Sequence, residues 1–306
     1  MSMADMVAWN NVLVATDFSA SGKEAVATAV ALAERSEGKL AVVSVAERPP
    51  MLPPLPMKRY SENPDELWGR EARRSMAALV KRLRKKLPGT RGFVRVGTPW
   101  REIVGLADEL GVESIVVGSR GLTGIQRLLL GSTAENVVRH APCPVLVVRD
   151  GALKRIRKVL VPVDWDEGSK AAVRYALERA GKGVEIRAIH AIGFPRQIEA
   201  EFADELSADA HSSRKLRGFL DRLGARDVPS KVVLGEPAEA ILEAAGDVDL
   251  IVIATRGRKG AARALLGSVA EKIVRRAEGP VLVVPPTRPR RAKRAGRRTL
   301  EGEVAR

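Results

Sequence analysis

Short runs of apolar, β-branched residues alternate along the chain with longer segments in which apolar positions recur every three to four residues. The run Val12–Ala15 is typical of a buried parallel strand. From about Lys23, apolar residues at positions 25, 26, 29, 30 and 33 share one face of a helix. The same alternation predicts strands at 40–45, 93–96, 114–117 and 144–148 and helices at 66–87, 100–110 and 133–140. Such alternation gives a parallel sheet covered by helices on both faces, so we predict a doubly wound α/β fold.

The second half of the chain repeats the first. VLVATDFS (12–19) recurs as VLVPVDWD (159–166), and RLLLGSTAENVVRHAPCPVLVV (127–148) recurs as RALLGSVAEKIVRRAEGPVLVV (263–284). The offset between the copies falls from 147 to 136 residues, because the first half carries a proline-rich stretch in a loop. We therefore predict two tandem domains, at 9–149 and 156–285.

Composition limits the class of protein. The chain has 306 residues, of which 45 % are apolar, and this suits two globular domains. It has no apolar run of the roughly 18 residues that a membrane span needs, and its N-terminus lacks the features of a secretory signal. One cysteine and three widely separated histidines give no disulfide and no metal-ligand spacing. We expect a cytoplasmic protein without a metal site of its own.

Positive charge is concentrated near the C-terminus. The net charge is +15, and the segment after Pro286 contains eight Lys and Arg residues against two Glu. Because this segment has few apolar residues to bury, we predict a disordered basic tail at 286–306 that is dispensable for folding. The tail can serve as an arm for RNA, DNA or anionic lipid, or it can simply raise solubility.

The strongest chemical signal is the sequence Gly118-Ser-Arg-Gly121, followed after nine residues by Gly131-Ser132. Its first glycine ends a predicted strand, where open α/β sheets bind ligands. Gly131-Ser132 begins a helix whose free N–H groups favour an anion, and Ser132 and Glu135 have the spacing of a capping box. Neither a P-loop nor the dinucleotide fingerprint is present. From spacing alone, a phosphate site and a purely structural loop both remain open.

Polar residues also follow the first strand of each half. Asp17 lies just past this strand, and Asp164 repeats it. A carboxylate there can accept hydrogen bonds from a ribose hydroxyl or an adenine amine, or it can close an Asx turn or cap the next helix. Ser21 and Glu24 have capping-box spacing, which predicts that Ser21 caps this helix.

The glycine pattern of residues 118–132, together with the ending HAPCPVLVV, resembles the ATP-binding motif of universal stress proteins. The opening VLVATDFS and the turn at 97–99 are also similar to that family. The likeness runs over nearly all of 9–149 and, more weakly, over 156–285. The combination is far more specific than any single glycine.

The resemblance implies a five-stranded parallel sheet in the order 3-2-1-4-5 in each half. Asp17 and Gly118 would then meet at the switch point, where such sheets bind ligands. Carried onto this chain, the resemblance implies that adenosine is surrounded by Thr16, Asp17 and Val45. The ribose and phosphates of ATP, with or without Mg²⁺, would be held by Gly118, Arg120, Gly121, Gly131, Ser132 and Thr133.

The second half departs from this pattern at one glycine. Ala254 stands in place of Gly118, whereas the other elements are kept as Asp164, Gly257, Gly267 and Ser268. A methyl group there would narrow the approach to a nucleotide and disfavour positive φ. We expect weaker binding or none in the second half, unless the basic loop Arg256–Lys259 offsets the lost glycine.

The last strand of each half, Val145–Val148 and Val281–Val284, lies at a sheet edge in the implied strand order. An exposed apolar edge invites pairing. The resemblance implies that these strands pair, so the two halves would pack within one chain as a pseudo-twofold pair. Two chains are also expected to associate as a homodimer.

Three functions fit these features. The first is an adenine-nucleotide-binding stress-response or signalling protein without strong catalysis. The second is a slow ATPase or nucleotidyltransferase-like enzyme, although the loop offers Arg120 and Ser132 without the acids or histidine that phosphoryl transfer uses. The third is nucleic-acid association through the Arg-rich tail, and a steep salt dependence would favour it. Loss of turnover on metal chelation would favour the enzyme.

Overall fold

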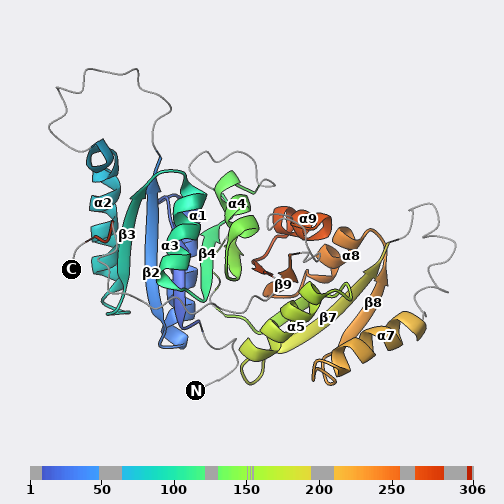
Figure 1. Cartoon of the computed structure of the whole chain (residues 1–306). Coiled ribbons are helices and arrows are strands. Elements are labelled where there is room, and N and C mark those ends of the chain that lie inside the picture. Colours follow the sequence, from blue (N-terminus) through green and yellow to red (C-terminus); the bar gives the residue numbers. More distant parts are fainter. Residues whose placement is uncertain are drawn as a thin grey trace.

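The computed structural model describes residues 9–47, 64–120, 130–149, 151, 153, 155–193, 210–255, 266–285 and 302–304. Its centre is a ten-stranded sheet with the order β3-β2-β1-β4-β5-β10-β9-β6-β7-β8. Helices cover the sheet on both faces (Figure 1). Within each half the strands follow the order 3-2-1-4-5, so the predicted doubly wound α/β fold is confirmed.

The first half contains β1 (Asn11–Ala15), α1 (Ala20–Arg35), β2 (Lys39–Ala46), α2 (Pro64–Leu83), β3 (Arg91–Val96), α3 (Pro99–Leu110), β4 (Ser114–Gly118), α4 (Ser132–His140) and β5 (Val145–Val148). Consecutive strand residues face opposite layers. Val12 therefore lies in the core under α1 and α2, and Leu13 lies in the core under α3 and α4. This double burial explains why the strands are continuous apolar runs rather than alternating patterns.

The second half contains β6 (Lys158–Pro162), α5 (Glu167–Arg179), β7 (Glu185–Ile192), α7 (Ala210–Asp221), β8 (Ser230–Leu234), α8 (Pro237–Ala244), β9 (Leu250–Ala254), α9 (Ser268–Arg276) and β10 (Val281–Val284). It repeats the topology of the first half in mirrored order along the sheet. Over the described ranges, no helix is both long and apolar enough to cross a membrane.

The two halves join through their last strands. β5 and β10 pair in antiparallel fashion, with Leu146 opposite Leu282, and both of these side chains are fully buried. The core clusters on both faces of the sheet contain residues from both halves. The predicted pairing of the two edge strands is therefore confirmed. Because the pairing is antiparallel, the carboxyl ends of the strands in the two halves point to opposite edges of the sheet.

The C-terminal residues 302–304 lie against the first half, beside β3 (Figure 1). Glu303 forms an antiparallel bridge with Phe93, and backbone hydrogen bonds flank the bridge on both sides. The prediction of a disordered tail is wrong for these three residues, because β3 is an edge strand whose backbone groups can accept a further strand. The basic residues between 288 and 298 lie outside the described residues.

Candidate functional site

The candidate site lies where β1 and β4 end side by side. These strands are parallel neighbours, so Asp17 and Gly118 both lie at the carboxyl edge of the sheet. Ligands bind at this switch point in open α/β sheets. Thr16 is buried directly before Asp17, and its hydroxyl accepts a hydrogen bond from the Phe18 amide (3.0 Å).

Asp17 closes an Asx turn, one of the two roles open to it from sequence. Its Oδ1 accepts hydrogen bonds from the amide (3.0 Å) and the hydroxyl (2.5 Å) of Ser19. Ser19 is the N-cap of α1 and accepts from the Gly22 amide (3.1 Å), so the prediction that Ser21 caps this helix is wrong. The tight turn places the N-cap of the helix two residues earlier than expected. The described contacts engage Oδ1 alone, which leaves Oδ2 available to a ligand.

The glycine loop returns to the sheet beside Ser119. The Gly131 amide donates to the Ser119 carbonyl (2.8 Å), and Gly131 is the N-cap of α4 with φ −63° and ψ 145°. No side chain of the described residues caps this end of the helix. The first amides of α4, at Ser132 and Thr133, therefore keep the positive end of the helix dipole open to an anion.

The spacing of Ser132 and Glu135 predicts a capping box, and this prediction is wrong because Glu135 pairs with arginines instead. It binds Arg139 one turn later (2.9 Å) and Arg275 of α9 (3.0 Å). These two arginines also pair with Glu271, at 3.0 and 3.2 Å, and the four side chains close a ring between the halves. Burial acts to raise the pKa of Glu135, but the hydrogen bonds and charges of Arg139 and Arg275 outweigh it and hold the pKa below its ordinary value.

Arg149 is a residue of this region that sequence reasoning missed. It follows β5 directly and is only 8 % exposed. One Nη donates to the Val274 carbonyl in the last turn of α9, whereas Nε has no hydrogen-bond partner among the described residues. Burial lowers the pKa of Arg149, and the positive charge of Arg120 lowers it further. A bound anion would relieve this repulsion between two guanidinium groups. The available signal was a charged residue directly after a fully apolar strand.

Gly118 is a glycine because of packing against α1. Its φ is not in the left-handed region, and an added Cβ would collide with Ser21 Oγ and lie 2.9 Å from the Ser21 carbonyl oxygen. In the second half Ala254 carries this Cβ, and Gly168 replaces Ser21. A Cβ on Gly168 would lie 3.0 Å from that of Ala254, so the two halves exchange which residue is small.

The expected reason for weak binding at Ala254 is therefore wrong. Its methyl group points toward α5 and occupies the space that Gly168 leaves free. Weaker nucleotide binding in the second half stays a prediction, and three other substitutions now support it. Val163, Val269 and Pro285 stand at the positions of Thr16, Thr133 and Arg149.

The other predicted residues of the second half keep their places in the fold. Gly267 is the N-cap of α9 with nearly the same dihedral angles as Gly131, and Ser268 follows it as an exposed residue. Asp164 is exposed, whereas Asp17 is half-buried. Two predicted site residues, Gly121 and Gly257, lie outside the described residues.

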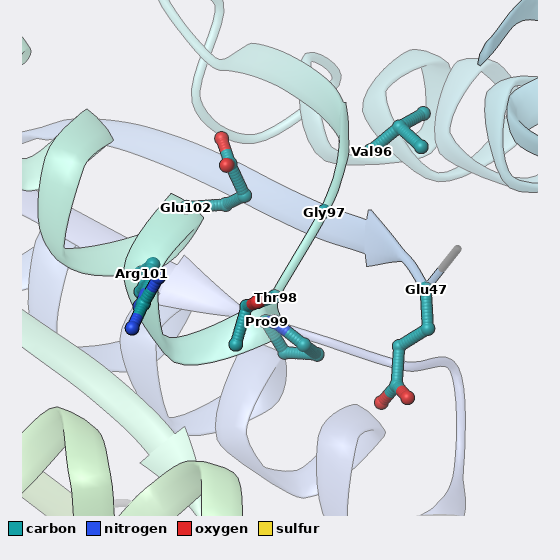
Figure 2. A pocket seen from close by; sticks show the side chains of 7 residues that line it. All are labelled: Glu47, Val96, Gly97, Thr98, Pro99, Arg101 and Glu102. Atoms are coloured by element: carbon teal, nitrogen blue, oxygen red, sulfur yellow. The ribbon is translucent and has the colours of Figure 1, made fainter. Parts of the chain in front are cut away.

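A hollow of about 400 Å³ lies at the turn between β3 and α3 (Figure 2). It is lined by Glu47, Val96, Gly97, Thr98, Pro99, Arg101 and Glu102. Figure 2 shows the carboxylates of Glu47 and Glu102 pointing away from each other. Two carboxylates against one guanidinium make this hollow a poor phosphate site. The hollow lies at the ends of β2 and β3, beside the switch point. Val45 is half-buried near the end of β2, two residues before Glu47.

Comparisons with known proteins agree with this arrangement. The model of the universal stress protein family matches residues 8–149 and 155–285. A universal stress protein of Mycobacterium tuberculosis is 30 % identical over 246 residues, which are 76 % of this chain and 81 % of that protein. A universal stress protein structure from Archaeoglobus fulgidus covers 91 % of this chain and 99 % of its own at 22 % identity, and its TM-score of 0.66 supports the fold. A universal stress protein in complex with cAMP is 26 % identical and covers 46 % of this chain and 98 % of its own, with a TM-score of 0.33.

Proposed function

The chain belongs to the universal stress protein family, and from this premise we propose that it is a cytoplasmic, adenine-nucleotide-binding stress-response or signalling protein whose first half binds ATP. The observation that carries the proposal is the convergence of Asp17 and the open N-terminus of α4 at one sheet edge. One group can bind the nucleoside and the other can bind phosphate. Strong catalysis forms no part of the proposal.

The phosphate end of the ATP site is built from backbone amides and guanidinium groups. The amides of Ser132 and Thr133 start α4, where the helix dipole favours negative charge. Arg149 adds a buried guanidinium whose Nε has no partner in the described part of the chain, and Arg120 adds a second positive charge nearby. Each of these groups stabilises a polyphosphate more than a neutral ligand.

The adenosine end is built from the ends of β1 and β2. In this proposal Asp17 Oδ2 accepts a hydrogen bond from a ribose hydroxyl or an adenine amine, while Oδ1 holds the turn through Ser19. Thr16 directly follows β1, and Val45 lies near the carboxyl end of the neighbouring strand β2. In the second half, valines replace Thr16 and Thr133, and Pro285 replaces Arg149. The proposed second site thus offers fewer hydroxyl donors and lacks the buried guanidinium of Arg149, and we expect it to be the weaker unless the basic loop Arg256–Lys259 offsets these losses.

Calorimetry with ATP and Mg²⁺ on two matched variants tests this proposal. Gly131→Val places a branched side chain at the N-cap of α4 and is expected to weaken ATP binding by about tenfold or more, which is a free-energy difference of about 1.4 kcal/mol. Gly267→Val makes the same change at the N-cap of α9 and is expected to remove little binding.

Equal losses in the two variants, or unchanged binding in Gly131→Val, would contradict the proposal. The alternative nucleotide to titrate is cAMP, which one member of the family binds. Binding of cAMP with none of ATP would keep the site and change its ligand.

A further inference from the structure

We propose that the outer edge of β3 is a docking site for the chain's own C-terminal segment, Gly302–Val304, and that this occupation keeps β3 from pairing with a second copy of the chain. β3 is the first strand in the sheet order, so one side of its backbone is open. An unpaired edge strand is a template for another strand. This surface is separate from the nucleotide site and does not depend on it.

The segment continues the sheet through its backbone. The Val94 amide donates to the Gly302 carbonyl (2.8 Å), and the Val304 amide donates to the Gly92 carbonyl (2.9 Å). The pairing is antiparallel and centred on Glu303. The Val94 amide and the Gly92 carbonyl, which face outward from β3, therefore both have hydrogen-bond partners in the same chain.

Gly302 and Val304 fit the edge of β3 sterically. Gly302 has φ +82°, a conformation that favours glycine, and an added Cβ would collide with the Val94 carbonyl oxygen. Val304 is partly buried and packs against the larger core cluster. Any side chain at position 302 or a polar side chain at position 304 would therefore oppose docking.

Glu303 holds the segment through an ion pair with Arg91. Its two carboxylate oxygens accept from Arg91 Nε (2.8 Å) and Nη2 (2.7 Å), a two-point pairing that fixes the register of the segment. The Arg91 guanidinium also lies 5.0 Å from the centre of the Phe93 ring. Hydrogen bonding to Glu303 raises the pKa of Arg91 despite partial burial. Only two acids stand among eight Lys and Arg residues after Pro286, and one of them meets this arginine.

The chain is long enough for the segment to dock on its own β3. Six strand-to-strand steps separate β10 from the docked segment on the outer edge of β3, which is about 29 Å at about 4.8 Å per step. The 17 residues from Pro285 to Gly302 can span up to about 55 Å when extended. No second copy is needed to supply the strand.

The opposite edge of the sheet lacks this docking site. β8 is the last strand in the order, and no strand in the described ranges pairs with its outer side. Pro229 and Lys231 stand at the positions of Arg91 and Phe93. Proline and lysine are residues that protect sheet edges from pairing. At these positions β3 has Arg91, whose charge is paired with Glu303, and the apolar Phe93. We therefore expect the edge of β3 to be covered by Gly302–Val304 rather than protected by its own sequence.

Hydrogen exchange at the Val94 amide, with light scattering, tests the proposal. In the full-length chain this amide should be protected. Deletion of residues 302–306, or Glu303→Arg, should speed its exchange by about tenfold or more, because its acceptor is lost. The double variant Arg91→Glu with Glu303→Arg restores the pair in reverse and should restore protection. The Val116 amide on central strand β4 serves as the folding control.

The truncated chain should also show a larger mass than the full-length chain at the same high concentration, as uncovered β3 edges pair. Unchanged Val94 exchange on truncation, or a double variant that does not recover protection, would overturn the docking site. Fast exchange without any gain in mass would overturn its blocking role. Val94 protection that rises with concentration in the full-length chain would show that a second copy supplies the segment, which overturns docking within one chain.

Discussion

Gly118 and Ser21 meet across the start of α1, and the second half reverses which of the two residues is small. A single copy of the sequence offers two explanations for such a glycine, close approach of a ligand or close approach of a helix. The paired change to Ala254 and Gly168 selects the helix, because a ligand contact would require no compensating change in α5. Residue-by-residue comparison of the halves therefore carries structural information of its own.

The variant Gly118→Ala should destabilise the first half by about 1–3 kcal/mol, the usual effect of an extra methyl group in a packed site. Adding Ser21→Gly should recover most of the loss, since it reproduces the pair found in the second half. Urea unfolding of the two variants measures this. A double variant less stable than Gly118→Ala alone would show that the space between strand and helix is not what limits residue 118.

The sequence placed Asp17 and Gly131 at the right edge of the sheet, because strand ends and glycine-rich turns are local features. It could not foresee Arg149, whose hydrogen-bond acceptor Val274 is 125 residues away in the other half. It also placed the cap of α1 at Ser21 instead of Ser19, since the Asx turn of Asp17 decides where that helix begins.

The elements themselves were predicted well where their signal is periodic, and their ends less well. The helix expected at 66–87 ends at Leu83, because the chain then tightens into turns in which the Lys85 and Lys86 amides bond back to the Arg82 and Leu83 carbonyls. The expected capping box of α4 failed for a tertiary reason. Arg275 of α9 lies 140 residues beyond Glu135 and draws its carboxylate away from the helix start.

The ring of ion pairs between α4 and α9 should make stability depend on pH. A carboxylate whose pKa is lowered in the folded state contributes stability above its unfolded pKa, and this stability is lost as pH falls through the folded pKa. For Glu135 the loss should therefore occur below its ordinary pKa of 4.5. Glu135→Gln should lower the free energy of unfolding by about 1 kcal/mol near neutral pH and should flatten the acid limb of the pH profile.

Urea unfolding between neutral and acid pH measures this effect. Glu167→Gln is the matched control, because Glu167 pairs with Lys170 on the solvent side of α5 and its side chain is 69 % exposed. That variant should lose little stability at any pH. Parallel pH profiles for wild type and Glu135→Gln would show that the ion-pair ring between α4 and α9 does not contribute pH-dependent stability.

At the scale of the whole molecule, the pairing of β5 with β10 joins two α/β units into one sheet. This was foreseeable, because both strands are short, apolar and terminal in the implied order. The docking of Gly302–Val304 was not, because three residues in a basic segment carry no periodic signal. The homodimer expected from sequence stays a prediction, and it would need a surface other than β5 or β10, which already pair.

The first half alone, residues 1–150, should associate in solution. Removing β10 exposes the β5 edge together with the buried face of Leu146, and a second copy can cover both. Light scattering at increasing concentration should show a dimer of this fragment. A fragment that stays folded and monomeric at high concentration would mean that β5 does not need a partner strand.

The contact between Arg149 and Val274 has no mirror image, since Pro285 occupies the equivalent place in the second half. In an assembly of two identical chains, every mutation appears twice and must be tolerated at both symmetric positions. Duplication within one gene removes that constraint. Selection can then tune one binding site while the sister copy diverges, as long as β5 and β10 still hold the two together.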